Sequence, residues 1–218
     1  MALRQEMARM TPDREPLKLG VLASGSGTNL EAIARAIDDG AVPARIALVL
    51  SDNPAAFALE RAKRWEIPTR VIELSDFGDR PAFDRAIVEA LRDAGVELVV
   101  LAGYMKLVGD EIVDAFENRI MNIHPALLPS FPGEDGVPDA LEHGVKVTGV
   151  TVHFVDKGLD TGPIIVQEAV NVAEGDNVET LHNRIHLSEY KVYPRAIRLF
   201  AEGRLTVEGR RVKILPPA

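Results

Sequence analysis

The stretch LKLGVLASGSGTNL, residues 17–30, contains the change of pattern that decides the fold. Residues 17–23 form a short apolar run, which is typical of a buried β-strand. Ser24–Gly27 follow at once as a glycine-rich turn, and apolar residues then recur from Leu30 to Ile37 at the spacing of one helical face. The stretch therefore predicts a strand, a tight turn and a helix.

The same alternation continues along the chain. Apolar runs that read as buried strands occur at residues 46–50, 69–72, 98–101 and 120–123, and helical patterns lie between them at residues 55–65 and 83–91. Strands that alternate with helices form a parallel sheet covered on both faces. The predicted fold class is α/β: a single domain with a mostly parallel, twisted sheet flanked by helices.

The alternation of strands and helices stops after the strand that ends at residue 123. Proline and glycine crowd residues 125–138, which predicts a long irregular loop. Two further strands are expected at residues 146–155 and 164–172, a helix at 177–201 that Pro194 should kink or split, and a hairpin at 205–214. We expect residues 1–16 to be a disordered leader and residues 17–218 to be one domain.

Composition excludes several classes of protein. The 218 residues contain no cysteine, so disulfides, thiolate zinc sites and cysteine nucleophiles are ruled out. The net charge of −8 argues against nucleic acid as a partner. No apolar run approaches the roughly twenty residues that a membrane-spanning helix needs. We therefore expect a soluble, cytoplasmic protein.

The glycine-rich turn is a candidate phosphate site. Glycines let the backbone approach an anion, and the start of the following helix adds partial positive charge. Thr28 is the expected N-cap, with Glu31 completing a capping box. Leu30 stands where a dinucleotide fingerprint needs its third glycine, so a phosphate monoester fits better. A tight turn that binds nothing is the open alternative.

Three polar residues suggest a catalytic group. Asn122 and His124 lie near the carboxyl end of a predicted strand and point to the same side, where an amide and an imidazole can hold a developing oxyanion. The plain alternative for His124 is a structural hydrogen bond at a strand end. Asp160 lies in a Gly-rich turn and has the alternative of ordinary turn chemistry. If the fold returns Asp160 to His124, we expect it to raise the pKa of the imidazole and orient the ring.

The run MNIHPALLPSFPG, residues 121–133, resembles the signature of the 10-formyltetrahydrofolate-dependent formyltransferases, in particular those that act on phosphoribosylglycinamide. The resemblance extends in the family's order over about residues 17–205, which makes the set specific. The further matching segments are ASGSGTNL at 23–30, VVLAGYMK at 99–106, VTVHFV at 150–155 and LDTGP at 159–163.

This resemblance implies a Rossmann-like formyltransferase fold and a role for each matched position. Asn122, His124 and Asp160 are the implied catalytic residues, with His153 supporting them, and Leu128–Pro129 is implied to be a cis peptide. The implied ribonucleotide site is Gly27, Thr28, Asn29 and Glu189. The implied folate site is Arg80, Met105, Lys106, Leu107, Val108, Val155, Asp156, Lys157, Gly158 and Leu159.

The activity implied is transfer of a formyl group from the cosubstrate 10-formyltetrahydrofolate to the amine of phosphoribosylglycinamide in purine biosynthesis. No metal or redox cofactor is required, and a homodimer is compatible with the sequence. A formyltetrahydrofolate hydrolase or a methionyl-tRNA formyltransferase would be expected to carry an additional amino-terminal regulatory or carboxyl-terminal basic domain, and neither appears in these 218 residues. A non-catalytic sugar-phosphate sensor is the alternative from another class, and the presence of all three catalytic residues argues against it.

One segment departs from the family pattern. Many members carry a histidine-bearing loop after the Pro-Gly pair, where this chain reads EDGVPD at residues 134–139. Contacts of that loop with substrate cannot be carried over, so these six positions remain unassigned.

Overall fold

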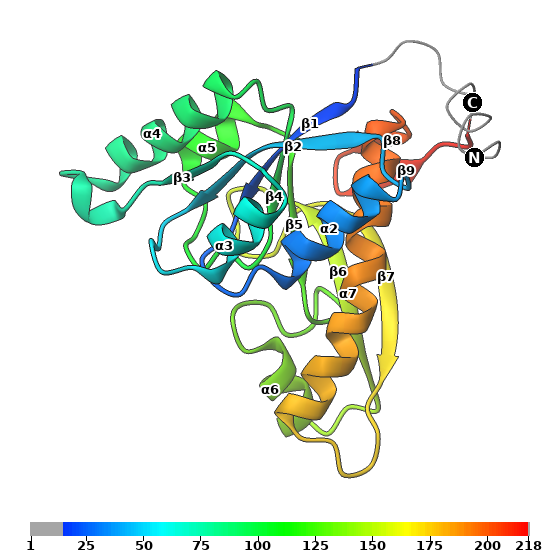
Figure 1. Cartoon of the computed structure of the whole chain (residues 1–218). Helices are drawn as coiled ribbons and strands as arrows, with labels where there is room; N and C mark the ends of the chain where they lie inside the picture. Colours follow the sequence, from blue (N-terminus) through cyan, green and yellow to red (C-terminus); the bar gives the residue numbers. More distant parts are fainter. Residues whose placement is uncertain (1–14, 218) are drawn as a thin grey trace.

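A computed structural model describes residues 15–217, and it contains the predicted strand, turn and helix (Figure 1). Strand β1 spans Leu17–Leu22 and helix α2 spans Thr28–Asp38. Of the expected leader, residues 1–14 lie outside the described residues, and Glu15 and Pro16 have no regular secondary structure.

Within the described residues, nine strands form one sheet in the order β3-β2-β1-β4-β5-β6-β7-β9-β8. Strands β1 to β5 pair in parallel, whereas β6 is antiparallel to both β5 and β7, so the prediction of a mostly parallel sheet is confirmed. The other strands are β2 (Ala44–Ser51), β3 (Thr69–Val71), β4 (Leu98–Leu101), β5 (Ile120–His124), β6 (Val147–Phe154), β7 (Ile164–Asn171), β8 (Leu205–Glu208) and β9 (Arg211–Ile214).

Helices cover both faces of the sheet and enclose two large apolar cores, beside a third, smaller apolar cluster. In Figure 1, α2, α3 and α7 lie on the near side, where they bury one core, and α4 and α5 bury the second core against the other face. The remaining elements are α3 (Phe57–Arg64), the 3₁₀ turn η1 (Leu74–Asp76), α4 (Arg80–Asp93), α5 (Asp110–Ala115), α6 (Gly136–Glu142) and α7 (Val178–Ala201).

Two helices differ from the prediction. Helix α7 runs unbroken through Pro194, because its buried residues pack along the sheet and hold the helix together across the missing hydrogen bond. Helix α6 begins at Gly136, inside the predicted irregular loop, and Pro138 falls in its first turn, where proline costs little. None of the helices in the described part is long and apolar enough to cross a membrane.

The order of the strands defines where a ligand can bind. The chain leaves β1 in one direction for β2 and β3, and returns on the other side of β1 for β4 and β5. Open α/β sheets bind ligands at such a reversal, at the carboxyl ends of the strands. The buried hydroxyl of Tyr193 donates to one of the backbone carbonyls of Leu101 and Met121 and lies 2.9 Å and 2.8 Å from them. This contact ties α7 to β4 and β5.

Candidate active site

The side chains of Asn122, His124 and Asp160 converge at the carboxyl end of β5. Asn122 and His124 are two residues apart on that strand, and Asp160 returns to them in the turn between β6 and β7. Nδ2 of Asn122 lies 3.4 Å from Oδ1 of Asp160, and Nδ1 of His124 lies 3.4 Å from Oδ2. The structure therefore supplies the proximity that sequence spacing left open, with one carboxylate oxygen beside each partner.

His124 is held between a carboxylate and a backbone carbonyl. Its Nε2 lies 2.6 Å from the carbonyl oxygen of Phe131, which can only accept, so Nε2 carries a proton. Burial is the largest influence on the pKa of His124 and holds it below its ordinary value. Asp160 acts to raise the pKa, as expected, and so does the Phe131 carbonyl, but together they do not outweigh burial.

Asp160 is an ionised carboxylate in a constrained turn. Its φ of 53° lies in the left-handed region, which aspartate tolerates better than most residues. The backbone N–H of Gly133 donates to Oδ2 at 2.8 Å, and Nε2 of His153 lies 3.5 Å from Oδ1. Burial alone would raise the pKa of Asp160, but these contacts and His124 hold it below its ordinary value. Nε2 of His153 also lies 3.3 Å from Nδ2 of Asn122, so this histidine contacts two members of the trio.

The glycine-rich turn between β1 and α2 differs from the prediction in its cap. Gly27, not Thr28, is the N-cap, with a φ of 71° that suits glycine, and a Cβ there would overlap the backbone of Ala58. Glu31 pairs with Arg35 at 3.0 Å instead of completing a capping box. Because Gly27 has no side chain with which to cap the helix, the first N–H groups of α2 are suited to bind an anion.

Asn29 and Glu189 are 160 residues apart in the sequence and form a buried hydrogen bond. Nδ2 of Asn29 donates to Oε2 of Glu189 at 2.9 Å, and the two residues are 8% and 4% exposed. Burial raises the pKa of Glu189. The contact joins α7 to the start of α2, so the residue expected to reach the sugar lies beside the expected phosphate site.

We expect a phosphate or sulfate ion on the backbone N–H groups of Gly27 to Asn29 when crystals grow from a medium that contains it. The physical reason is the combination of close backbone approach and the positive end of α2. The measurement is anion density in a crystal structure. An empty turn, with the anion bound elsewhere, would count against the phosphate site.

The two segments expected to bind folate are both held by ion pairs and hydrogen bonds. Nη2 of Arg80 donates to the backbone carbonyl of Leu107, while its Nε lies 2.8 Å from Oδ1 of Asp84. Lys157 pairs with Asp114 of α5 at 2.8 Å. Arg80 therefore supports the segment of residues 105–108 in this structure, with two of its nitrogens engaged by the protein.

Apolar side chains of these segments are exposed. Met105 and Leu107 are 67% and 69% exposed, and Leu159 is 53% exposed. Val108 and Val155 are partly buried against the second core. Apolar surface of this kind suits a flat aromatic ligand. The other residues of the expected folate site make contacts within the protein: Oδ1 of Asp156 accepts from the N–H of Gly158, and Nζ of Lys106 lies 3.6 Å from Oδ2 of Asp52.

The proline-rich loop covers His124. Leu128–Pro129 is cis, as predicted. Phe131, which sequence reasoning missed, has a φ of 54° and directs its carbonyl at the imidazole. Gly136 lies close to the same ring, since a Cβ at this position would be only 3.2 Å from Nε2 of His124. Phe131 belongs to the matched signature, but the contact uses its backbone, so the residue type carries no signal for it.

Asp135→Ala is expected to leave turnover within about threefold of the natural protein. Asp135 is exposed, and its side chain does not cap α6, so the substitution removes no contact seen near the trio. Steady-state rates at saturating substrates measure the effect. A collapse in rate would mean that residues 134–139 supply a catalytic group of their own.

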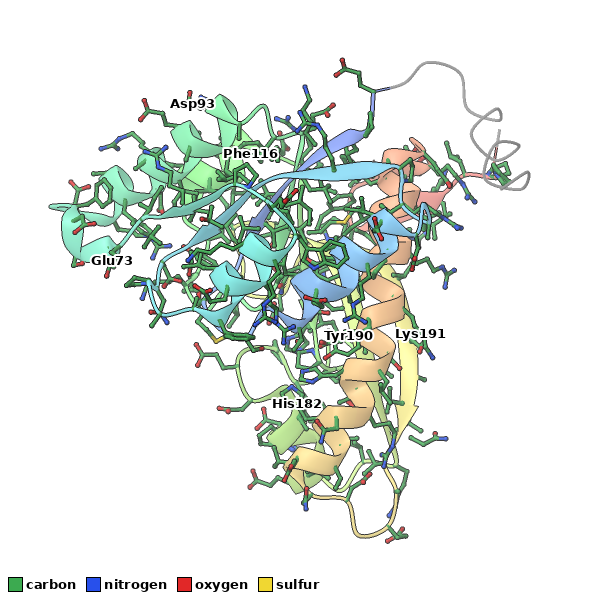
Figure 2. The ribbon with its side chains drawn as sticks, in the orientation of Figure 1. Glu73, Asp93, Phe116, His182, Tyr190 and Lys191 are labelled. Carbon is green, nitrogen blue, oxygen red and sulfur yellow. The ribbon has the colours of Figure 1, made fainter. Side chains whose placement is uncertain are left out.

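His182 and His186 pack along α7, with ring centroids 4.1 Å apart. Figure 2 shows His182 near the start of the helix and Tyr190 farther along it. Nε2 of His186 lies 3.9 Å from Oε2 of Glu189. Between residues 15 and 217, no group of three or more histidine, cysteine, aspartate or glutamate residues is arranged to hold a metal ion.

Comparisons with known proteins agree with this geometry. The formyl transferase family model matches residues 17–197. Phosphoribosylglycinamide formyltransferase of Bacillus subtilis is 48% identical over 83% of this chain and 93% of its own length, and that of Mycobacterium tuberculosis is 44% identical over 94% of each. The crystal structure of glycinamide ribonucleotide transformylase 1 from Symbiobacterium toebii superposes with a TM-score of 0.91 at 54% identity, covering 93% of this chain and 95% of the other. The chain therefore belongs to the formyl transferase family.

Proposed function

We propose that this chain transfers the formyl group of 10-formyltetrahydrofolate to the amine of phosphoribosylglycinamide. The products are formylglycinamide ribonucleotide and tetrahydrofolate, and the reaction is a step of purine biosynthesis. The observation that carries the proposal is the convergence of Asn122, His124 and Asp160 at the reversal point of the sheet. Relatives that bear this enzyme's name, at 44% and 48% identity over nearly their whole length, support it.

The chemistry begins with attack of the amine nitrogen on the formyl carbon. As the new C–N bond forms, the carbonyl electron pair moves onto oxygen and gives a tetrahedral intermediate with an oxyanion. His124 and Asn122 then donate hydrogen bonds to that oxygen, and the bond from Nε2 of His124 to Phe131 is exchanged for one to the oxyanion. Collapse of the intermediate breaks the bond from the same carbon to the folate nitrogen.

Asp160 moves the proton. The attacking nitrogen becomes positively charged, and the leaving folate nitrogen needs a proton, so a carboxylate near both must accept one and deliver it, directly or through a water molecule. Asp160 can take this role because it is ionised at neutral pH and lies beside both Asn122 and His124. The phosphate site and the folate segments hold the two substrates in line, which supplies much of the rate.

The test is a spectrophotometric assay of folate product, run with and without phosphoribosylglycinamide. Formyl transfer requires the nucleotide, so product must depend on its concentration. Product formed equally well without nucleotide would identify a hydrolase. Binding of the nucleotide without turnover would identify a sugar-phosphate sensor.

Lys106→Ala is expected to weaken binding of the folate more than binding of the nucleotide. Lys106 belongs to the expected folate segment of residues 105–108, not to the expected phosphate-binding turn. Its ammonium lies 3.6 Å from Oδ2 of Asp52. The measurement is the KM for each substrate at saturation of the other. Equal increases in both constants would show that the segment is wrongly assigned.

A further inference from the structure

Ser24 links the carboxyl ends of three neighbouring strands. It follows β1, which lies between β2 and β4 in the sheet. The Ser24 hydroxyl donates to Oδ1 of Asp52, the residue after β2, at 2.5 Å. The same oxygen accepts from the backbone N–H of Met105, beyond β4, at 2.9 Å. Ser24 is 9% exposed and the Asp52 side chain is 7% exposed, so both hydrogen bonds are shielded from water.

These contacts also join the two expected substrate sites. Ser24 is the first residue of the glycine-rich turn, and Met105 is the first residue of the folate segment 105–108. The second carboxylate oxygen of Asp52 lies 3.6 Å from Nζ of Lys106. Asp52 therefore holds the segment twice, through the Ser24 hydroxyl and through the Lys106 ammonium.

Asp52 determines how the Ser24 hydroxyl is oriented. A hydroxyl has one proton and two lone pairs, so a hydroxyl that donates to Asp52 turns a lone pair toward Met105. A hydrogen bond to a carboxylate is stronger than one between neutral groups, and it fixes this rotamer. Without Asp52 the hydroxyl is free to rotate, and the Met105 N–H loses its oriented acceptor.

We propose that Asp52 and Ser24 are positioning residues for the folate. Asp52 orients Ser24, and Ser24 anchors the backbone of Met105, which sets the distance between segment 105–108 and the phosphate-binding turn. Neither residue touches the reacting atoms. The inference rests on the proposed function, because that function assigns the folate to this segment.

Calorimetric titration of the natural protein and its variants with tetrahydrofolate and with phosphoribosylglycinamide tests the proposal. Ser24→Ala is expected to raise the Kd for tetrahydrofolate about tenfold, the effect of losing one shielded, charge-assisted hydrogen bond, and to leave the Kd for the nucleotide within about twofold. Asp52→Ala should weaken tetrahydrofolate binding at least as much, because it also removes the partner of Lys106. Because Asp52 orients the Ser24 hydroxyl, the two losses should not add, and the double variant should bind tetrahydrofolate little worse than Asp52→Ala.

Two further variants separate positioning from general damage. Asp52→Asn keeps an oxygen that accepts from Ser24 and should restore most of the affinity lost in Asp52→Ala. Thr148→Val is the matched control, because the buried Thr148 hydroxyl on β6 has no hydrogen-bond partner among the described residues and valine keeps the shape of the side chain. It should leave both Kd values unchanged.

Equal losses for both ligands, additive losses in the double variant, or the same loss in Thr148→Val would each overturn the positioning role. Calorimetry reads binding without turnover, so it also separates this inference from the proposed function. A natural protein that binds both ligands but transfers no formyl group would contradict only the function. One that binds no tetrahydrofolate would contradict both.

Discussion

Replacing His124 by alanine is expected to lower turnover by roughly 10² to 10³, the usual cost of removing one oxyanion donor. His124 is 3% exposed, and its protonated Nε2 is aimed at an acceptor oxygen 2.6 Å away in the present structure. The oxyanion is stronger as an acceptor than the Phe131 carbonyl, so the donor matters most in the transition state. The loss should therefore appear in kcat, with little change in either KM.

The control for this substitution is another histidine. His182→Ala removes an imidazole that packs against His186 on α7 and makes no hydrogen bond or ion pair with the trio among the described residues, so it should leave kcat within about twofold. Thermal unfolding of both variants shows whether the cavity left by His124 has disturbed the fold. A kcat for His124→Ala close to that of the natural protein, in a folded variant, would remove His124 from the mechanism.

The fold was predictable because its signals are local. The apolar run at residues 17–23, the glycine-rich turn and the helical spacing after it are each readable within one short window. The errors arose where distant contacts decide the outcome. Judged by its local effect alone, Pro194 should interrupt the helix. The packing of α7 along the sheet outweighs the hydrogen bond that proline cannot make. The cap of α2 moved to Gly27 because the turn must pass close to Ala58.

The residues of the candidate site were proposed from residue types and family resemblance, but the electrostatics of the site could not be predicted. No sequence window relates Asp160 to His124, or Asn29 to Glu189 across 160 residues. The sign of the shift in the pKa of His124 depends on burial, which outweighs the attraction of Asp160. The contact of the Phe131 carbonyl with His124 uses a backbone group that every residue has, so the residue type does not reveal it.

Asp160→Asn is expected to lower turnover at least as much as His124→Ala, while affinity for the nucleotide changes little. Asparagine keeps the shape of the side chain and is among the few residues that tolerate the φ of 53° at this position. Its carbonyl oxygen can still accept from the N–H of Gly133. What it removes is the charge and the proton acceptor, so the loss in kcat measures those two properties directly.

The double variant His124→Ala/Asp160→Asn shows whether the two residues act as a unit. Nδ1 of His124 and Oδ2 of Asp160 are 3.4 Å apart. Asp160 acts to raise the pKa of His124, and His124 acts to lower the pKa of Asp160. When the carboxylate no longer orients the ring, removing the ring should cost little more, so the double variant should be only slightly slower than the slower single variant. The measurement is kcat for the natural protein, both single variants and the double variant at saturating substrates. Rate losses that multiply, so that their free energies add, would mean that His124 and Asp160 contribute independently and that the trio is not a coupled catalytic unit.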